Sequence, residues 1–281
     1  MYKKTIKIAA ILIGTSFLAS CGGVNEKETA LVEEETATEE MVITEEDMNQ
    51  VDYVLPSPLQ IAQLFKNAGL TYVGDLTNSS DKADNYNSKY DQKLNYGVYA
   101  ADMAYCIINN QTQESINYLG SLKELSEKLW MTDIMGSMGL SDRLGANVGN
   151  EDSLTYIMAD LQMQMDDYLD ENGMGYTGSI IFTGAWIETM YLAAKVNETE
   201  ANPKLISRLS EQAVILGGLI ASIKQNDKDN DFADLVTDLE KINGHFTGFN
   251  DESVEEFTLS DEAVKALSAD LIEIRTKIVG E

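Results

Sequence analysis

Proline is scarce in this chain, and its positions limit where helices can break. The three prolines stand at positions 56, 58 and 203, so no proline interrupts residues 59–202 or the chain beyond 203. Apolar residues recur three and four positions apart through most of this length, which is the spacing of a buried helix face. Alternation of apolar and polar residues over strand lengths is scarce. The pattern therefore predicts an all-α fold.

The clearest single helix begins at Ser57. Ser57 is a typical N-cap residue, Pro58 suits a first helical turn, and Gly69 suits a helix end. Further helices are predicted at about 86–109, 113–131, 151–171, 178–196, 203–225, 230–243 and 260–279. Residues 51–281 should thus form a single domain of about eight helices, packed as one bundle or as two similar helical halves.

The first twenty residues have the pattern of an export signal. Three lysines among the first seven residues precede the apolar run 8–19, which is too short to span a bilayer core of about 30 Å. The run ends in Leu-Ala-Ser-Cys at 18–21, which resembles the bacterial lipobox. We therefore expect a signal peptide at 1–20 and a lipid on Cys21; the alternative is an ordinary secretory signal that ends near a cysteine.

An acidic segment follows Cys21. Residues 22–50 hold ten acids, one lysine and no aromatic residue, so they bury too little apolar surface to offset the entropy of ordering. Residues 21–50 are predicted to be a disordered tether. Loss of the signal removes three lysines and no acid, which changes the formal charge from −27 to −30. Binding of nucleic acid by charge is therefore not expected.

Two predicted helices are apolar almost all round, and each carries one acid. Residues 97–108 (GVYAADMAYCII) contain Asp102, and residues 178–194 (GSIIFTGAWIETMYLAA) contain Glu188. A helix of this kind is buried on most of its faces. A carboxylate buried there is costly unless it is paired, hydrogen-bonded or protonated. Each acid should therefore have a partner.

Three interpretations of these acids stay open. They could have a structural partner, such as a tyrosine hydroxyl, a helix N-terminus or one of the arginines Arg143, Arg208 and Arg275. They could instead line an internal pocket for a small polar or cationic ligand. The residues predicted for such a ligand site are Asp102, Glu188, Tyr99, Tyr105, Trp186 and Tyr191. In the third interpretation the acids meet water.

The surroundings of the two acids also suggest an internal duplication. Each acid is followed three positions later by a tyrosine, and further on by Leu-Ser-Glu at 125–127 and at 209–211. The two copies would span about 86–130 and 178–225.

Motifs for cofactors and metals fail on their context. Residues 173–178 (GMGYTG) match the dinucleotide-binding pattern but follow a predicted acidic helix instead of a strand. Residues 227–231 have the ligand spacing of a calcium loop, but Phe232 stands where that loop needs glycine. His245 is the single histidine, too few for the common zinc and di-iron sites. No cofactor, metal site or catalytic residue is predicted.

Several segments resemble a known group of proteins. Residues 90–106 (YDQKLNYGVYAADMAYC), 116–129 (INYLGSLKELSEKL) and 184–192 (GAWIETMYL), with Pro-Ser-Pro-Leu at 56–59, are similar to a family of uncharacterised helical lipoproteins of Bacteroidota. The resemblance covers most of the chain from about residue 53. It implies a helical fold and a cell-envelope location, with outer-membrane attachment expected and the membrane face undetermined, but no activity.

Three functions therefore remain. The preferred hypothesis is a membrane-anchored binding or accessory module for a small ligand or an envelope protein. The alternatives are an enzyme that uses Asp102 and Glu188 as acid and base, and a purely structural envelope lipoprotein. The enzyme needs the two carboxyl groups within about 10 Å of each other at a solvent-connected cleft.

Overall fold

The computed structural model describes residues 6–10, 39–43, 56–131, 139–147, 150–249 and 257–281. It divides the chain into two compact units, Met1–Tyr53 and Val54–Glu281. Cys21 and most of the predicted tether lie outside the described residues. The lipid site and the tether therefore stay predictions.

In the first unit, the described residues form an antiparallel pair of strands. β1 (Ile6–Ala10) pairs with β2 (Glu39–Ile43), so that Ile6 lies opposite Ile43 and Ala10 opposite Glu39. β1 belongs to the predicted signal peptide and β2 to the predicted tether. The predicted cleavage before Cys21 would remove β1 and with it this pairing.

The second unit is helical and confirms the predicted all-α fold class. Its first half contains α2 (Pro58–Asn67), η1 (Ser80–Asn85), α3 (Lys89–Ile108), α4 (Thr112–Lys128), α6 (Leu140–Ala146) and α7 (Glu151–Glu171). Its second half contains α8 (Gly175–Thr199), α9 (Pro203–Glu211), α10 (Ala213–Asn226), α11 (Ala233–Asn243), η2 (Gly244–Phe246) and α12 (Asp261–Val279).

Local capping explains several helix starts. The Ser57 hydroxyl accepts a hydrogen bond from the Gln60 N–H at 3.2 Å, and the Gln60 side chain accepts one from the Ser57 N–H at 2.7 Å. This reciprocal capping box fixes the start of α2, with Pro58 in the first turn. Asn202 caps α9 and Ser260 caps α12 through a side-chain oxygen that accepts a hydrogen bond from the backbone N–H of Lys204 and of Ala263, respectively.

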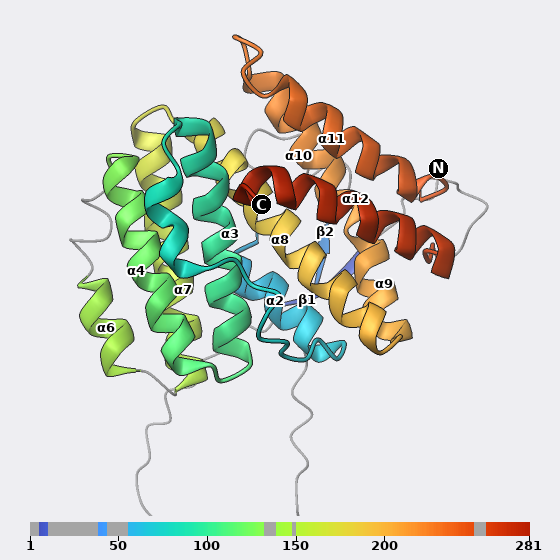
Figure 1. Cartoon of the computed structure of the whole chain (residues 1–281), viewed down its shortest axis with the longest axis horizontal. Helices are drawn as coiled ribbons and strands as arrows, with labels where there is room; N and C mark the ends of the chain where they lie inside the picture. Colours follow the sequence, from blue (N-terminus) through green and yellow to red (C-terminus); the bar gives the residue numbers. More distant parts are fainter. Residues whose placement is uncertain (1–5, 11–38, 44–55, 132–138, 148–149, 250–256) are drawn as a thin grey trace, which may run out of the picture. The chain divides into compact units, whose positions relative to one another are not determined.

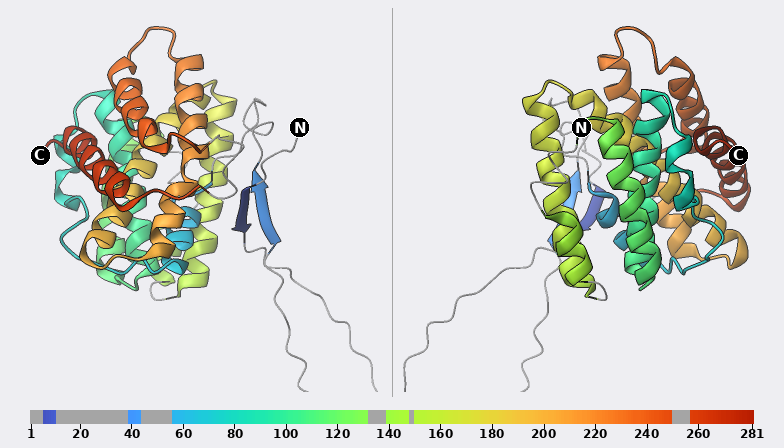
Figure 2. Two further views of the ribbon diagram at one scale, coloured as in Figure 1. Left: turned by 90° about the vertical axis from the view of Figure 1, so that its right-hand side faces the viewer. Right: turned by 60° about the vertical axis from the view of Figure 1, so that its left-hand side comes forward.

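Helices α3 and α8 form the centre of the helical unit. Within that unit, Figure 1 shows α4, α6 and α7 on one side of α3 and α8, and α9 to α12 on the other. The right-hand view in Figure 2 shows the same separation, with the green and yellow-green helices on one side and the orange and red helices on the other. Because both central helices are covered on most faces, their apolar sequence is buried as expected.

Two glycines let α3 and α8 approach closely. A Cβ atom on Gly97 would lie 1.8 Å from the carbonyl oxygen of Ile181, and one on Gly184 would lie 2.0 Å from that of Leu94. Each glycine thus faces the backbone of the other helix, and no larger residue fits there. Lys93 on α3 lies beside Tyr176 on α8, and Asp102 further along α3 interacts with Glu188 further along α8, so the two helices run in parallel.

The structure corrects the helix predicted at 203–225. The chain forms two helices there, α9 and α10, which meet at Gln212. The continuous apolar periodicity conceals the change of direction, because Gln212 itself keeps helical backbone angles (φ −70°, ψ −8°). By length and composition, Pro203–Asn226 could cross a membrane, with a mean hydropathy of 1.2, but 61% of its apolar window is buried inside the fold. It is a core element of the helical unit.

Candidate functional site

The parallel crossing of α3 and α8 places Asp102 beside Glu188. Asp102 lies five residues after Gly97 on α3, and Glu188 lies four residues after Gly184 on α8. Both side chains are completely buried, at 0% exposure. The two carboxyl groups are close enough that each shifts the pKa of the other. The structure therefore brings together the two acids that the sequence singled out.

Glu188 is paired with an arginine. The Arg275 Nε donates to Glu188 Oε2 at 2.8 Å, and Arg275 is itself only 4% exposed. Burial raises the pKa of Glu188, while the adjacent guanidinium acts to lower it. Burial acts to lower the pKa of Arg275, but the Glu188 carboxylate outweighs it and the pKa is raised. Glu188 and Arg275 thus form a buried ion pair of the kind anticipated among the structural partners.

Asp102 is the acid of the pair that more strongly favours the protonated form. Its Oδ2 accepts a hydrogen bond from the Asn78 N–H at 3.1 Å. Burial raises the pKa of Asp102 well above its usual range, and the neighbouring Glu188 carboxylate adds to the rise. If both acids were ionised, Asp102 Oδ1 and Glu188 Oε1 would have no donor among the described residues. One proton on Asp102, donated to Glu188, satisfies both oxygens.

Residues 70–79 cover this cluster. The Asn78 N–H binds Asp102, and the Leu76 carbonyl accepts from Arg275 Nη2 at 3.2 Å. Tyr99 and Tyr105 fasten the same segment to α3: the Tyr99 hydroxyl donates to the Ser79 carbonyl at 2.8 Å, and the Tyr105 hydroxyl donates to the Thr71 carbonyl at 2.6 Å. The hydroxyls of these two tyrosines are thus bound to backbone.

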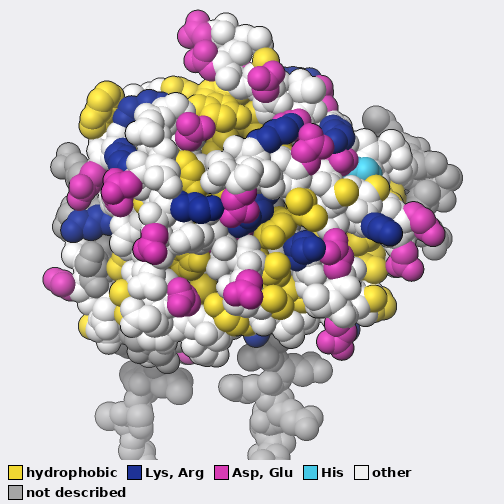
Figure 3. Space-filling model, in the orientation of Figure 1, with side chains coloured by type: hydrophobic (Ala, Val, Ile, Leu, Met, Phe, Trp, Pro, Cys, Tyr) yellow, Lys and Arg dark blue, Asp and Glu magenta, His cyan; other side chains and the backbone are white. Residues whose placement is uncertain are grey.

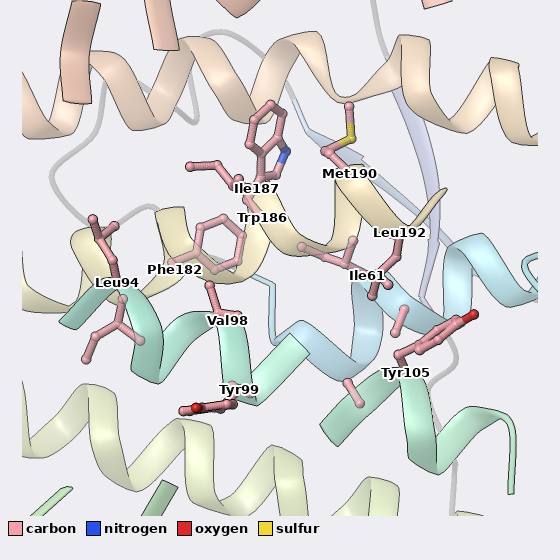
Figure 4. Packing of buried hydrophobic residues seen from close by; sticks show 14 of the residues in the cluster. Ile61, Leu94, Val98, Tyr99, Tyr105, Phe182, Trp186, Ile187, Met190 and Leu192 are labelled. Atoms are coloured by element: carbon pink, nitrogen blue, oxygen red, sulfur yellow. The ribbon is translucent and has the colours of Figure 1, made fainter. Parts of the chain in front are cut away.

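The remaining predicted aromatic residues have different positions. The Arg275 guanidinium lies 4.4 Å from the centroid of the Tyr191 ring, so Tyr191 belongs to the cluster. Figure 4 shows that Trp186 on α8 points away from Tyr99 and Tyr105 on α3, toward a different neighbouring helix. The four aromatic side chains therefore do not converge on one space. A ligand at the two acids remains a prediction.

A small cavity lies elsewhere in the helical unit. Its volume is about 20 Å³, the space of about one water molecule. It is lined by Ser57, Pro58, Leu59, Tyr96, Ala100, Leu122, Met158, Leu161, Gln162 and Met165. None of the six predicted ligand-site residues lines it.

A polar stripe on α3 went unnoticed in the sequence. Gln92, Asn95, Tyr99 and Asp102 are buried and follow one another three, four and three positions apart, which places them on one face of the helix. The stripe faces the end of α12, where Asn95 Nδ2 donates to the Ile278 carbonyl at 2.8 Å. The same spacing rule that identifies an apolar face would have found it.

The calcium-like segment has a structural role. Asp227 Oδ1 accepts from the Asp231 N–H and Oδ2 from the Phe232 N–H, both at 2.8 Å. The carboxylate thereby holds the loop before α11. Within the described ranges, no group of three or more His, Cys, Asp or Glu side chains could hold a metal ion.

Comparison with known protein families, with curated proteins and with solved structures finds no match. The resemblance to helical lipoproteins therefore depends on the sequence segments alone.

Proposed function

We propose that the protein is a lipoprotein of the bacterial cell envelope, anchored in the outer membrane through a lipid on Cys21, and that its helical unit is a binding or accessory module. The observation that carries the proposal is the Leu-Ala-Ser-Cys sequence at 18–21, directly after a lysine-led apolar run. The several acyl chains of such an anchor give stable attachment without a transmembrane helix.

The burial of the two acids supports a module without catalysis over the carboxylate enzyme. An acid and a base that act on substrate need access to it. Asp102 and Glu188 are both completely buried, and one oxygen of each accepts a hydrogen bond, from the Asn78 N–H and from Arg275 respectively. The same closed cluster would also suit a purely structural lipoprotein, so the anchor is the part of the proposal to test first.

The test is fatty-acid labelling of the full-length chain in a bacterial host, with Cys21→Ala as the variant. The wild-type chain should carry the label, fractionate with membranes and begin at Cys21 after processing. Cys21→Ala should lose the label and the membrane attachment. The matched control is Cys106→Ala, which changes the other cysteine of the chain, a buried residue of α3. That variant should be labelled like the wild type. A wild-type chain without label would contradict the proposal.

A further inference from the structure

Two exposed aromatic rings lie where α4 ends and α8 begins. Trp130 follows α4 and is 77% exposed, and Tyr176 in the first turn of α8 is 40% exposed. Trp186, the other tryptophan of the chain, is completely buried. Large aromatic side chains dominate interaction surfaces because one ring removes much apolar area from water.

The backbone at Trp130 is unfavourable for a tryptophan. Its φ is +60°, in the left-handed region. The Trp130 N–H donates to the Glu127 carbonyl and the Met131 N–H to the Ser126 carbonyl, which closes the end of α4. Glycine is the residue that favours this position, and a side chain there costs about 1 kcal/mol. Helix termination alone therefore does not account for a tryptophan.

Two lysines on α3 lie over the two rings, one over each. The Lys89 ammonium lies 4.1 Å from the centroid of the Trp130 ring, and the Lys93 ammonium lies 4.6 Å from that of Tyr176. Lys89 and Lys93 are four residues apart, so they occupy successive turns of one helix face. We call these four residues the aromatic–lysine patch. Tryptophan, tyrosine and lysine are the residues that accumulate at the boundary between a bilayer and water.

The patch lies close to the point where the chain reaches the helical unit. Pro58, at the start of α2, shares its small cavity with Tyr96 and Met165. Tyr96 follows Lys93 by three residues on α3. Met165 precedes Tyr168 by three residues on α7, and the Tyr168 hydroxyl donates to the Trp130 carbonyl at 3.3 Å. The start of α2 therefore contacts α3 three residues from Lys93, and α7 three residues from Tyr168, the residue that binds Trp130.

We propose that the aromatic–lysine patch docks on the surface of the bilayer that holds the lipid anchor, with both rings at the interface and both ammonium groups at the lipid phosphates. This inference rests on the proposed anchor at Cys21. As a disordered chain, the predicted tether of residues 21–50 has a root-mean-square reach of about 30 Å. Such a tether holds the patch at an effective concentration on the order of 1 mM. A contact with a dissociation constant of about 1 mM is then about half occupied.

The docked lipid should be neutral overall. The chain carries 47 acidic and 20 basic residues, and Figure 3 shows acidic side chains spread among lysines and arginines over the face that it presents. An anionic bilayer would repel most of such a surface. Phosphatidylcholine offers the phosphates without the net charge.

The test couples the chain from Cys21 onward, through the Cys21 thiol, to a maleimide lipid in phosphatidylcholine vesicles with brominated acyl chains. Cys106 is completely buried and leaves Cys21 as the accessible thiol. Bromine quenches a tryptophan that reaches the interface, and the buried Trp186 supplies a constant background. We expect the Trp130 emission to be quenched and shifted to the blue, and Trp130→Phe to abolish the lipid-dependent change. Vesicles rich in phosphatidylglycerol should quench less.

Variants that keep the reporter locate the contact. Lys89→Glu with Lys93→Glu, and separately Tyr176→Ala, should weaken docking about tenfold, which lowers the docked fraction from about one half to about one tenth. Tyr156→Ala is the matched control: Tyr156 is 71% exposed but lies twelve residues, about 18 Å, before Tyr168 on α7. In Tyr156→Ala, the Trp130 emission should be quenched as in the wild type.

Two results would overturn the docking proposal. If brominated lipid leaves the Trp130 emission unchanged, the patch does not contact the bilayer and would serve a soluble partner instead. If the double lysine variant is quenched as strongly as the wild type, the patch is not the contact. Because the coupling is chemical, either result would leave the lipid anchor untouched. A wild-type chain that carries no fatty-acid label in cells would instead contradict the lipid anchor and leave the docking result untouched.

Discussion

The contact between α3 and α8 has two levels along the helices. At the glycine level it depends on close packing of backbone against backbone, and at the acid level it depends on charge. At the first level, Gly97 and Gly184 each face the backbone of the other helix, and the two helices alone complete the contact. At the second level, about 6 to 8 Å further along both helices, Asp102 and Glu188 meet in the same interior. That level needs Arg275 from α12 and a backbone N–H from outside both helices.

The difference shows that one helix pair can combine a contact that does not respond to pH with one that does. Close packing of backbone against backbone depends on the absence of a side chain and is indifferent to pH. The buried acids depend on one proton and one guanidinium, so they respond to pH and to isosteric changes of charge. Variants at the two levels should therefore fail in different ways.

The largest effect is expected at the glycine level. Gly97→Ala places a Cβ 1.8 Å from the Ile181 carbonyl oxygen, so the two helices must separate. We expect a loss of about 4 kcal/mol or more of unfolding free energy, or no folded protein. The added Cβ would meet backbone atoms, which cannot move aside without shifting the whole helix. Denaturant unfolding followed by circular dichroism measures it.

The matched control is Gly120→Ala on α4, where an added Cβ has no neighbour within 4 Å. Alanine favours a helix over glycine, so this variant should be neutral or more stable by up to about 1 kcal/mol. Equal effects at positions 97 and 120 would show that the close approach is not required.

At the acid level, the two acids should differ. Glu188→Gln removes the buried counterion of Arg275, which keeps only the half-exposed Glu281 at 3.4 Å, and should cost about 3 to 5 kcal/mol of unfolding free energy. Asp102→Asn replaces a neutral acid by a neutral amide that can still donate to Glu188, and should cost less than about 1.5 kcal/mol. Denaturation at pH 7 compares them, and equal losses would place the shared proton elsewhere.

The pH dependence should distinguish the levels most directly. The folded-state pKa of Asp102 is raised above its ordinary value of 3.8, so the folded chain keeps a proton that the unfolded chain releases. The stability that this proton supports is complete below pH 3.8 and declines as pH rises through the folded-state pKa. Asp102→Asn should thus gain in stability relative to the wild type as pH rises. A difference that stays constant from pH 4 to 8 would contradict the protonated acid.

The smallest effect is expected where the charge network reaches solvent. Glu281 pairs with Lys82 at 2.9 Å and with Arg275 at 3.4 Å, but its side chain is 47% exposed. Glu281→Gln should cost at most about 1 kcal/mol, and less at high salt. The Lys82 hydrogen bond lowers the pKa of Glu281 below 4.5. Its contribution is therefore present above pH 4.5 and lost as pH falls, opposite in sign to that of Asp102.

The sequence alone determined the helical class and most helix limits. The serine and asparagine caps and the prolines are local signals, and α2, α7 and α12 begin and end within a residue or two of their predicted positions. It also identified Asp102 and Glu188 as buried acids in need of partners, because an isolated charge in an apolar helix is costly whatever surrounds it.

Only the tertiary structure decided which partners they have. Arg143 and Arg208 pair with nearby acids, at sequence separations of 17 and 3 residues. Arg275, which is 87 residues from Glu188, is the arginine that reaches the site, and Asn78 comes from a segment without regular structure. Helical periodicity records which face is buried but not what is packed against it. The pairing of the acids depends on how closely the two glycines let α3 and α8 approach. It also depends on two segments packed against that crossing, α12 with Arg275 and the segment that contains Asn78.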